Sequence, residues 1–309
     1  MRSIALSLFL IASGMLNAQP LARHNLYPYN AAFANPSATG MSGCFEIVAT
    51  DMHQWVGISD APNLQSLSVQ KGIPFRRNKK NGVGINLIRD SNGPSKSMAG
   101  ELLYSFHTLV GKNRTTWLAF GISGIAEQRR LNEGEFSPVF DPLVTGSMQQ
   151  ELVYNASAGV NLYNDKYFAG FAFYNLLPVN LNLGLGYGGD RYFMSFQGGY
   201  LFANKNNPLA LQTSLQGFAG RTEWQVDLAN TLYLSENLWT RLTLRKYLGE
   251  FSTSGQNILL FLGYRWNNWE ISYCYNFDIN RTQFHHYGTH QLALGYRICP
   301  SKLNCPAYH

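Results

Sequence analysis

The sequence is poor in charged residues and has no long apolar run beyond its first residues. Charged residues make up 14% of the 309 residues, against about 25% in a typical soluble domain. No segment after residue 18 approaches the length of apolar chain that a transmembrane helix needs, so transmembrane helices are excluded. No helical period of useful length is present either. A dense basic stripe is also absent, so the net charge of +6 does not indicate a nucleic-acid partner.

The first eighteen residues have the layout of a secretory signal peptide. Arg2 precedes an apolar run from Ile4 to about Leu16, and the small Gly14 lies shortly before the expected cleavage site after Ala18. The run is too short to span a bilayer as a helix. No cysteine lies at the expected cleavage site that follows it, so a lipoprotein anchor is not expected. The chain is therefore predicted to be exported.

The mature sequence is rich in aromatic residues, and its apolar and polar residues alternate with a period of two. Aromatics reach 14% of the chain. In the stretch WEISYCYNFD one face carries Trp269, Ile271, Tyr273, Tyr275 and Phe277, and the other carries Glu270, Ser272, Cys274, Asn276 and Asp278. One apolar and one polar face is what a strand between lipid and a polar lumen requires. The pattern predicts an outer-membrane β-barrel.

Segments of this kind number about fourteen. Strands are expected near 44–54, 63–73, 81–90, 97–110, 115–130, 150–163, 166–176, 191–203, 208–221, 224–235, 238–248, 254–266, 269–279 and 288–298. The prediction is an all-β chain, with a transmembrane antiparallel barrel over residues 44–298 and periplasmic termini. An even strand number and short periplasmic turns suit this topology, and the longest connections, at 131–149, 177–190 and 279–287, all fall on the outer side.

Two segments lie outside the predicted barrel. Residues 19–43 are rich in Asn, Ala, Pro and Gly, and they predict an extended segment at the periplasmic mouth or within the lumen. Residues 299–309 form a periplasmic tail that contains two of the four cysteines. In an oxidising compartment we expect a Cys299–Cys305 disulfide first, and Cys44 with one of these two as the alternative, because the first and last strands of a closed barrel are neighbours. Cys274 is expected to be free on the lumen face.

No constellation in the sequence predicts catalysis or a cofactor. His285, His286 and His290 are spaced too loosely for a metal site, and Ser195 and His107 have no recognisable catalytic partner. The lumen charges do not form one selectivity ring; they are Glu270, Asp278, Asp227, Arg265 and Arg297. The basic cluster from Arg76 to Lys80 is interpreted as a solvated turn, with contact to anionic lipid or a partner as the alternative. Glycines such as Gly82 and Gly84 are interpreted as permitting bends or close packing in the lumen.

Four short motifs follow one another along the chain. They are Asn35-Pro36-Ser37-Ala38-Thr39-Gly40, then Gln54-Trp55-Val56-Gly57 with Ala61-Pro62, then Gln65-Ser66-Leu67-Ser68, and then Gly82-Val83-Gly84. In order and spacing the chain resembles the PorP/SprF family of type IX secretion system outer-membrane proteins, whose motifs are N-P-A-x-x-G, W-x-G-x-x-G-A-P, Q-S-L-S and G-x-G. It departs from them at Ser37 and Asp60, where the family more often has Ala and Gly.

The resemblance implies an integral outer-membrane protein that is not an enzyme. Some family members are similar to proteins that export or hold one large surface adhesin, and others to anchors for periplasmic lipoproteins. The expected partners are therefore a secreted adhesin, periplasmic lipoproteins of the secretion system, and outer-membrane lipid. The alternative is an outer-membrane channel or hydrophobic-ligand transporter, with the N-terminal segment as a plug.

The motif residues are the candidate contact site of the family; they are Asn35, Pro36, Gly40, Trp55, Gly57, Ala61 and Pro62. Trp55 is expected at the outer end of the first strand. One interpretation is that it belongs to an interfacial aromatic girdle. The other is that, together with Gly57, Ala61 and Pro62, it contacts the N-terminal segment or a partner.

Overall fold

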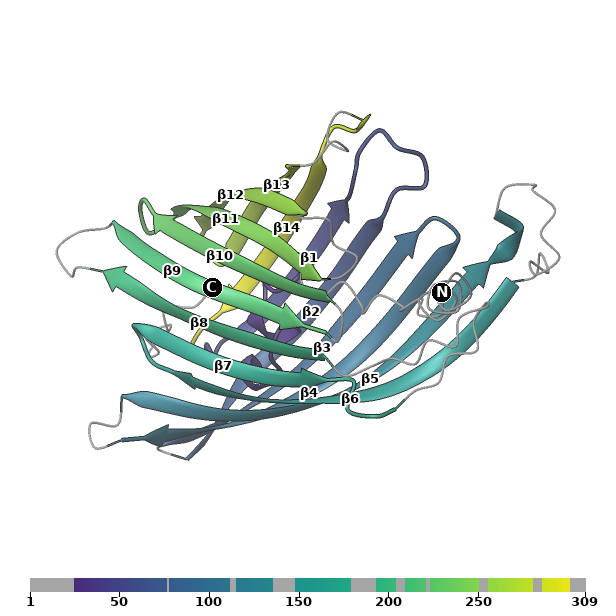
Figure 1. Ribbon diagram of the computed structural model, residues 1–309. Coiled ribbons are helices and arrows are strands. Elements are labelled where there is room, and N and C mark those ends of the chain that lie inside the picture. The colour runs from purple at the N-terminus through teal and green to yellow at the C-terminus, as the bar shows by residue number, and fades with distance from the viewer. Residues whose placement is uncertain are drawn as a thin grey trace, which may run out of the picture.

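Fourteen antiparallel strands close into one barrel (Figure 1). The computed structural model describes residues 25–76, 78–111, 115–135, 148–178, 193–203, 209–220, 223–249, 255–279 and 285–300. The expected signal peptide, residues 1–18, and Cys305 in the C-terminal tail lie outside the described residues. Within the described ranges, no helix combines the length and the hydropathy needed to cross a membrane.

The expected strand number is confirmed, and the boundaries shift by a few residues. The strands are β1 (Phe45–His53), β2 (Asn63–Arg76), β3 (Lys79–Asn92), β4 (Ser95–Val110), β5 (Thr116–Asn132), β6 (Met148–Tyr163), β7 (Tyr167–Tyr174), β8 (Phe193–Ala203), β9 (Ala210–Ala219), β10 (Glu223–Tyr233), β11 (Leu238–Gly249), β12 (Gln256–Trp266), β13 (Trp269–Asp278) and β14 (Thr289–Ile298). Several of β2 to β6 run longer than predicted, because their polar ends stay paired after the apolar alternation has stopped.

Each strand pairs with its neighbours in sequence, and β1 pairs with β14. The closing pair is antiparallel and runs from Phe45 opposite Ile298 to His53 opposite His290. Closure pairs the first strand with the last, so the sheet has no first or last strand with an open edge, which is the condition for crossing lipid with strands.

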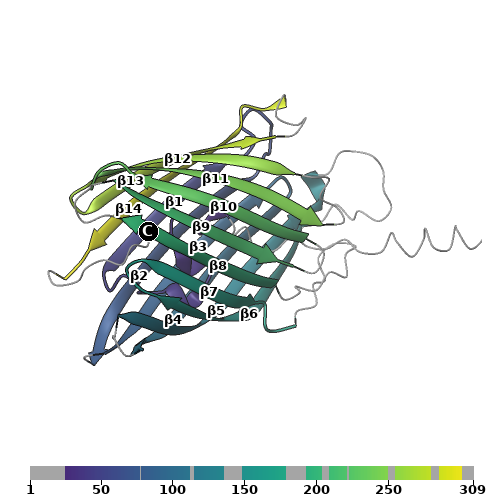
Figure 2. The same cartoon turned by 60° about the vertical axis from the view of Figure 1, so that its left-hand side comes forward.

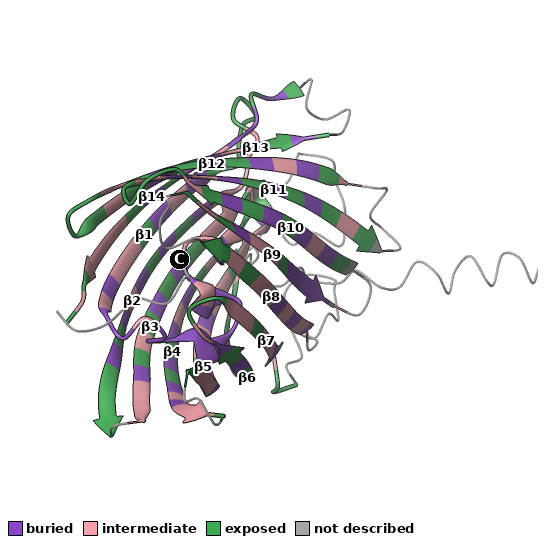
Figure 3. Cartoon of the chain, turned by 90° about the vertical axis from the view of Figure 1, so that its left-hand side faces the viewer, coloured by how far each residue is buried: buried purple, intermediate pink, exposed green. Residues whose placement is uncertain are grey.

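The two faces of the wall differ as the sequence predicts. On β12 the outward Leu260 and Leu262 are more than half exposed, whereas the inward Leu259 and Phe261 are almost fully buried. Figure 3 shows this alternation of exposed and buried residues along most strands. The outward apolar residues form the surface that faces lipid.

The connections orient the barrel in the membrane. The longest ones, residues 133–147, 175–192 and 279–288, leave the end opposite to the one where β1 begins and β14 ends. The first of them starts with the short turn η4 (Glu133–Glu135). Short turns such as 164–166 and 267–268 lie at the other end (Figure 2). Short turns mark the periplasmic end of bacterial barrels, so β1 begins there.

The N-terminal segment is folded inside the barrel and is not extended as predicted. It contains two 3₁₀ turns, η2 (Ala31–Phe33) and η3 (Pro36–Ala38). Asn30 and Asn35 cap them, each with a side-chain oxygen that accepts a backbone N–H two residues later. The caps thus give two backbone N–H groups of the segment a hydrogen-bond acceptor within the segment itself. In an extended segment these groups would need acceptors on the barrel wall.

Candidate functional site

A row of small residues crosses the inner wall over seven neighbouring strands. Each member is the direct cross-strand partner of the next; in order from β2 to β8 they are Gly72, Gly82, Ser105, Gly121, Gly159, Ala172 and Ser195. We call this set the small-residue row. Its side chains project little from the inner wall, so another part of the chain can approach the wall along this line. Of its members, sequence reasoning singled out only Gly82, for close lumen packing, and Ser195.

The N-terminal segment lies along this row from one end to the other. Ser195 on β8 donates to the carbonyl of Ala34. Ser105 on β4 donates to the carbonyl of Thr39 at 2.7 Å. At the far end the backbone N–H of Gly40 donates to Gln70 Oε1 on β2 at 3.1 Å. The segment is therefore seated against the barrel wall along this row.

The glycines of the row are required by the closeness of this contact. A Cβ atom on Gly82 would lie 2.0 Å from the Thr39 carbonyl oxygen, and one on Gly121 would lie 2.2 Å from the Ser37 nitrogen. On Gly159 it would lie 2.1 Å from Asn35 Oδ1. Contacts this short do not occur between real side chains and their neighbours, so only glycine permits the segment to approach the wall.

Asn35, the first of the motif residues, joins the segment to two strands. Its side-chain oxygen accepts from the Ser37 backbone nitrogen at 3.0 Å, and its side-chain nitrogen donates to the Val160 carbonyl on β6 at 3.0 Å and to the Phe171 carbonyl on β7 at 3.3 Å. The residue is fully buried. Pro36 then opens η3, a position where its missing N–H is harmless.

A buried ion pair holds the other end of the segment. Asp227 on β10 accepts from Arg245 on β11 at 2.9 Å and 2.8 Å, and from the hydroxyl of Tyr27 at 2.8 Å. Arg245 also donates to the side chain of Asn25 at 2.6 Å. Burial is the main reason that the pKa of Tyr27 is raised far above its usual range, and the negative charge of Asp227 raises it further. The phenol therefore remains protonated and keeps donating to Asp227.

The lumen charges named from the sequence form separate pairs. Besides the Asp227 pair, Arg265 contacts Glu270 at 2.8 Å and Arg297 contacts Glu46 at 2.7 Å. Asp278 lies 3.4 Å from His286. Among the residues that the structure describes, these charges make local polar contacts and no single ring around a pore.

Trp55 is turned toward the lumen at the outer mouth, so the interfacial girdle is the wrong interpretation of this residue. Its indole nitrogen donates to Asp278 Oδ2 at 2.9 Å. The neighbouring Val56 exchanges backbone hydrogen bonds with the β13–β14 connection, donating to Gly288 at 2.9 Å and accepting from Tyr287 at 2.7 Å. The tryptophan turn thus contacts another outer connection.

The remaining residues of the second motif shape this turn. Gly57 has φ of +103°, and a Cβ atom there would lie 2.9 Å from the Tyr287 ring. The carbonyl of Pro62 accepts from the Gln54 nitrogen at 2.9 Å and closes the turn, with Ala61 next to it in the chain. The two motifs therefore serve different ends of the barrel: one seats the N-terminal segment, and the other joins two outer connections.

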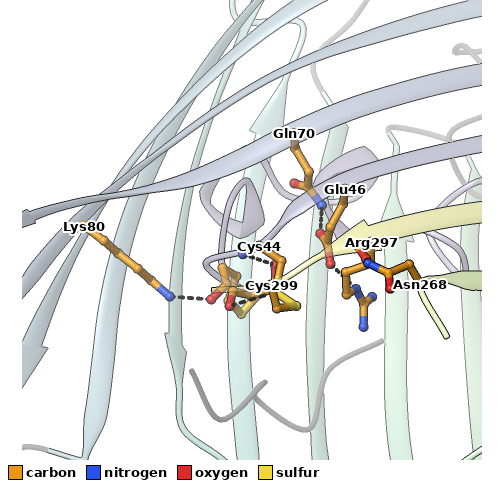
Figure 4. The surroundings of a disulfide bond; sticks show 9 residues. Cys44, Glu46, Gln70, Lys80, Asn268, Arg297 and Cys299 are labelled. Carbon is orange, nitrogen blue, oxygen red and sulfur yellow. Dashed lines mark hydrogen bonds and ion pairs between the residues drawn. A yellow bond between two sulfur atoms is a disulfide. The ribbon is translucent and has the colours of Figure 1, made fainter. Parts of the chain in front are cut away.

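A disulfide closes the periplasmic end of the seam between β1 and β14. Cys44 is bonded to Cys299, so the Cys299–Cys305 pair expected first is not formed. The reason is the register, which places Phe45 opposite Ile298 and hence the two cysteines next to each other. Figure 4 shows Glu46 beside this bond, between Gln70 and Arg297. Cys274 is free and buried.

The disulfide should be visible by electrophoresis. We expect the unfolded, unreduced chain to migrate faster than the reduced chain, because a bond across 255 residues compacts it. Cys44→Ser and Cys299→Ser should each abolish the difference, and Cys305→Ser should leave it intact. Loss of the difference in Cys305→Ser alone would contradict the assignment.

The side chains considered for catalysis are engaged in structural contacts. His107 contacts Ser105 and the Thr39 carbonyl through Nε2, and Tyr163 through Nδ1. Ser195 lies on β8, four strands away, against Ala34. His290 contacts Tyr273. Across the described ranges, no group of three or more metal-ligating side chains comes together.

Lys80, the last residue of the basic cluster, has a structural role. Its ammonium group donates to the carbonyl of Met41 and lies over the rings of Trp117 and Tyr163, at 4.8 Å and 5.4 Å from their centroids. Lys80 therefore helps to hold the N-terminal segment at the periplasmic end, and the solvated-turn interpretation does not apply to it.

Comparison with known families agrees with the motif residues. Residues 16–296 match the sequence model of the type IX secretion system membrane protein PorP/SprF. The chain belongs to the PorP/SprF family. This PorP/SprF protein is accordingly an outer-membrane component of type IX secretion. Two of the motifs by which the sequence resembles the family have a place in the structure. The Asn35 motif lies in the seated N-terminal segment, and the Trp55 motif forms the turn at the outer mouth.

Solved structures show similarity in fold alone. The toluene transporter TbuX of Ralstonia pickettii has a TM-score of 0.51 at 9% identity, covering 86% of this chain and 92% of the transporter. The CymD monoaromatic hydrocarbon channel has the same TM-score and identity, covering 87% of this chain and 92% of its own. No match was found among the curated proteins.

Proposed function

We propose that this PorP/SprF protein acts as a closed scaffold in the outer membrane. In this role it aids the export and surface attachment of a large adhesin, or couples the outer membrane to periplasmic lipoproteins of the secretion system. It performs no chemistry and conducts no solute. Membership of the family supports the secretion role, and the seated N-terminal segment supports the closed state.

The observation that carries the proposal is the fit between the segment and the small-residue row. Gly82 and Gly121 let the backbone of the segment contact the wall, and Gly159 makes room for the Asn35 side chain. A plug that must open during transport gains little from such contacts, because every one of them has to break in each cycle. A permanent element of the scaffold gains stability from all of them.

The alternative is a channel or a hydrophobic-ligand transporter. Similarity in fold to a toluene transporter and to a hydrocarbon channel agrees with it, as do two cavities inside the barrel. A solute would have to pass residues 25–43, which are held by hydrogen bonds along their length. Uptake of a solute by liposomes that contain the purified barrel would favour this alternative.

Deletion of the gene tests the proposal. The surface and the culture medium of the deletion strain are analysed by quantitative mass spectrometry. We expect one large surface protein to be lost from the cell surface, and to return when the wild-type gene is supplied. A Gly124→Ala gene is a suitable second control, because a Cβ atom there has no neighbour within 4 Å. Unchanged export and attachment of every surface protein would refute the proposal.

A further inference from the structure

A cavity of about 110 Å³ lies inside the periplasmic end of the barrel. Its wall includes Asn267 and Asn268 of the β12–β13 turn, so it lies next to the periplasm. A second cavity of about 100 Å³ extends along the N-terminal segment and shares part of the same wall. The residues common to both are Tyr29, Glu46, Val48, Arg241 and Arg297. The two cavities are therefore adjoining compartments of one space, which we call the periplasmic vestibule.

Arg241 on β11 lies at the junction of the two compartments. Its Nε donates to Thr243 at 3.2 Å, and its Nη2 lies 3.5 Å from the Tyr27 hydroxyl. The guanidinium carbon lies 5.6 Å and 5.7 Å from the ring centroids of Tyr27 and Phe261. Within the described part of the chain Arg241 makes no ion pair, whereas Arg265 and Arg297 each have a glutamate partner.

Two further polar atoms of the vestibule have no hydrogen-bond partner among the described residues. They are the hydroxyl of Tyr29 and the Nη2 atom of Arg265, and both are buried. Buried donors are paired in most proteins, so these two are suited to hold a ligand. Together with Arg241, these atoms form a set of three donors, two of them cationic, within one vestibule.

The chemistry of this set suits a carboxylate. Guanidinium groups form their strongest hydrogen bonds with carboxylate and phosphate oxygens. A side-chain carboxylate has the size for a space of this volume, and the rings of Tyr233 and Trp239 supply an apolar wall for its methylene groups. Membrane lipid touches the outer face of the barrel, whereas the vestibule is inside it, so the ligand arrives from the periplasm.

We propose that the periplasmic vestibule binds an acidic side chain from a peptide segment of a periplasmic partner, through Arg241, Arg265 and Tyr29. The inference rests on the proposed function for the nature of the partner, and it identifies the chemistry by which that partner is recognised. Arg241 supplies a positive charge that forms no ion pair with a carboxylate among the described residues. Tyr29 and Arg265 supply the donors that orient the bound group.

Peptide binding to the purified full-length protein in detergent micelles tests this site. The probe is a fluorescein-labelled peptide with two glutamates flanked by alanines, and the reference is the same peptide with glutamine in place of glutamate. Fluorescence anisotropy should show the glutamate peptide binding at least about tenfold more tightly, as expected for a charge-assisted contact. Equal affinity for the two peptides, or binding of neither, would overturn the proposal.

Substitutions locate the binding to the vestibule. Arg241→Gln should weaken binding of the glutamate peptide about tenfold, and Tyr29→Phe should weaken it about fivefold, since it removes one hydrogen bond. Arg89→Gln makes the same charge change on an exposed position of β3 and should leave the affinity unchanged. A loss in Arg89→Gln equal to that in Arg241→Gln would reveal a general charge effect and overturn the assignment.

Two controls accompany the binding measurement. Heat-dependent migration on a gel shows whether each variant forms the barrel before binding is measured. Displacement of the peptide by free succinate at equal affinity would indicate a small-acid site and overturn the peptide assignment. The measurement uses no cargo protein. Its failure is therefore distinguishable from failure of the proposed function, which would appear as unchanged surface proteins in the deletion strain.

Discussion

Replacing Asp227 with alanine should lower the free energy of unfolding of the barrel by about 3–5 kcal/mol, the usual effect of removing one partner from a buried ion pair. Arg245, with side-chain exposure of 1%, would keep its charge in the lumen without the carboxylate. The Tyr27 hydroxyl would lose its acceptor at the same time. Both losses loosen the N-terminal segment, because Arg245 also contacts Asn25.

Denaturant titration of the protein folded in lipid vesicles measures this effect. Asp51→Ala is the matched control, because Asp51 pairs with His53 on an exposed part of β1. Exposed pairs contribute at most about 1 kcal/mol, so the control should unfold almost as the wild type does. Similar unfolding of the two variants would show that the Asp227 pair does not stabilise the barrel and the seated segment.

Replacing Gly121 with alanine should destabilise the protein by about 1–3 kcal/mol, the usual effect of overpacking. The added Cβ atom would lie 2.2 Å from the Ser37 nitrogen and 2.4 Å from the Pro36 carbonyl carbon. These are backbone atoms, so no side chain can rotate to make room. The N-terminal segment must move away from the wall, and its backbone becomes accessible to protease.

The same strand offers the control for this prediction. Gly124→Ala makes the same chemical change three residues further along β5, where a Cβ atom has no neighbour within 4 Å. It should leave both unfolding and proteolysis unchanged. Limited proteolysis followed by mass spectrometry of the cleaved peptides measures accessibility of residues 25–43. Equal protection of this segment in Gly121→Ala and in the wild type would show that it is not seated on Gly121.

The barrel could be predicted from the sequence because its signal is local. Alternation in a stretch such as residues 269–278 requires only neighbouring residues, and the same period of two recurs in most strands. The parity of short and long connections then oriented the chain. Boundaries were less accurate, since pairing continues into polar residues such as Lys79 that carry no alternation.

The site could be predicted only in part because it depends on register. Gly121 and Gly159 are 38 positions apart in sequence, and only the β5–β6 register makes them partners. The disulfide has the same cause: the sequence brought Cys44 near Cys299 through closure, but could not rank this pair above the nearer Cys305. For Trp55 the sequence located the turn correctly, but could not show that Asp278, 223 residues away, accepts its indole N–H.

A lumen closed by the N-terminal segment should carry no ions, and electrical conductance measures this. The wild-type full-length protein is inserted into a planar lipid bilayer, with insertion verified by protease protection of the strands. We expect no steady ion current through the inserted wild-type protein. A steady current characteristic of an open barrel would contradict this expectation.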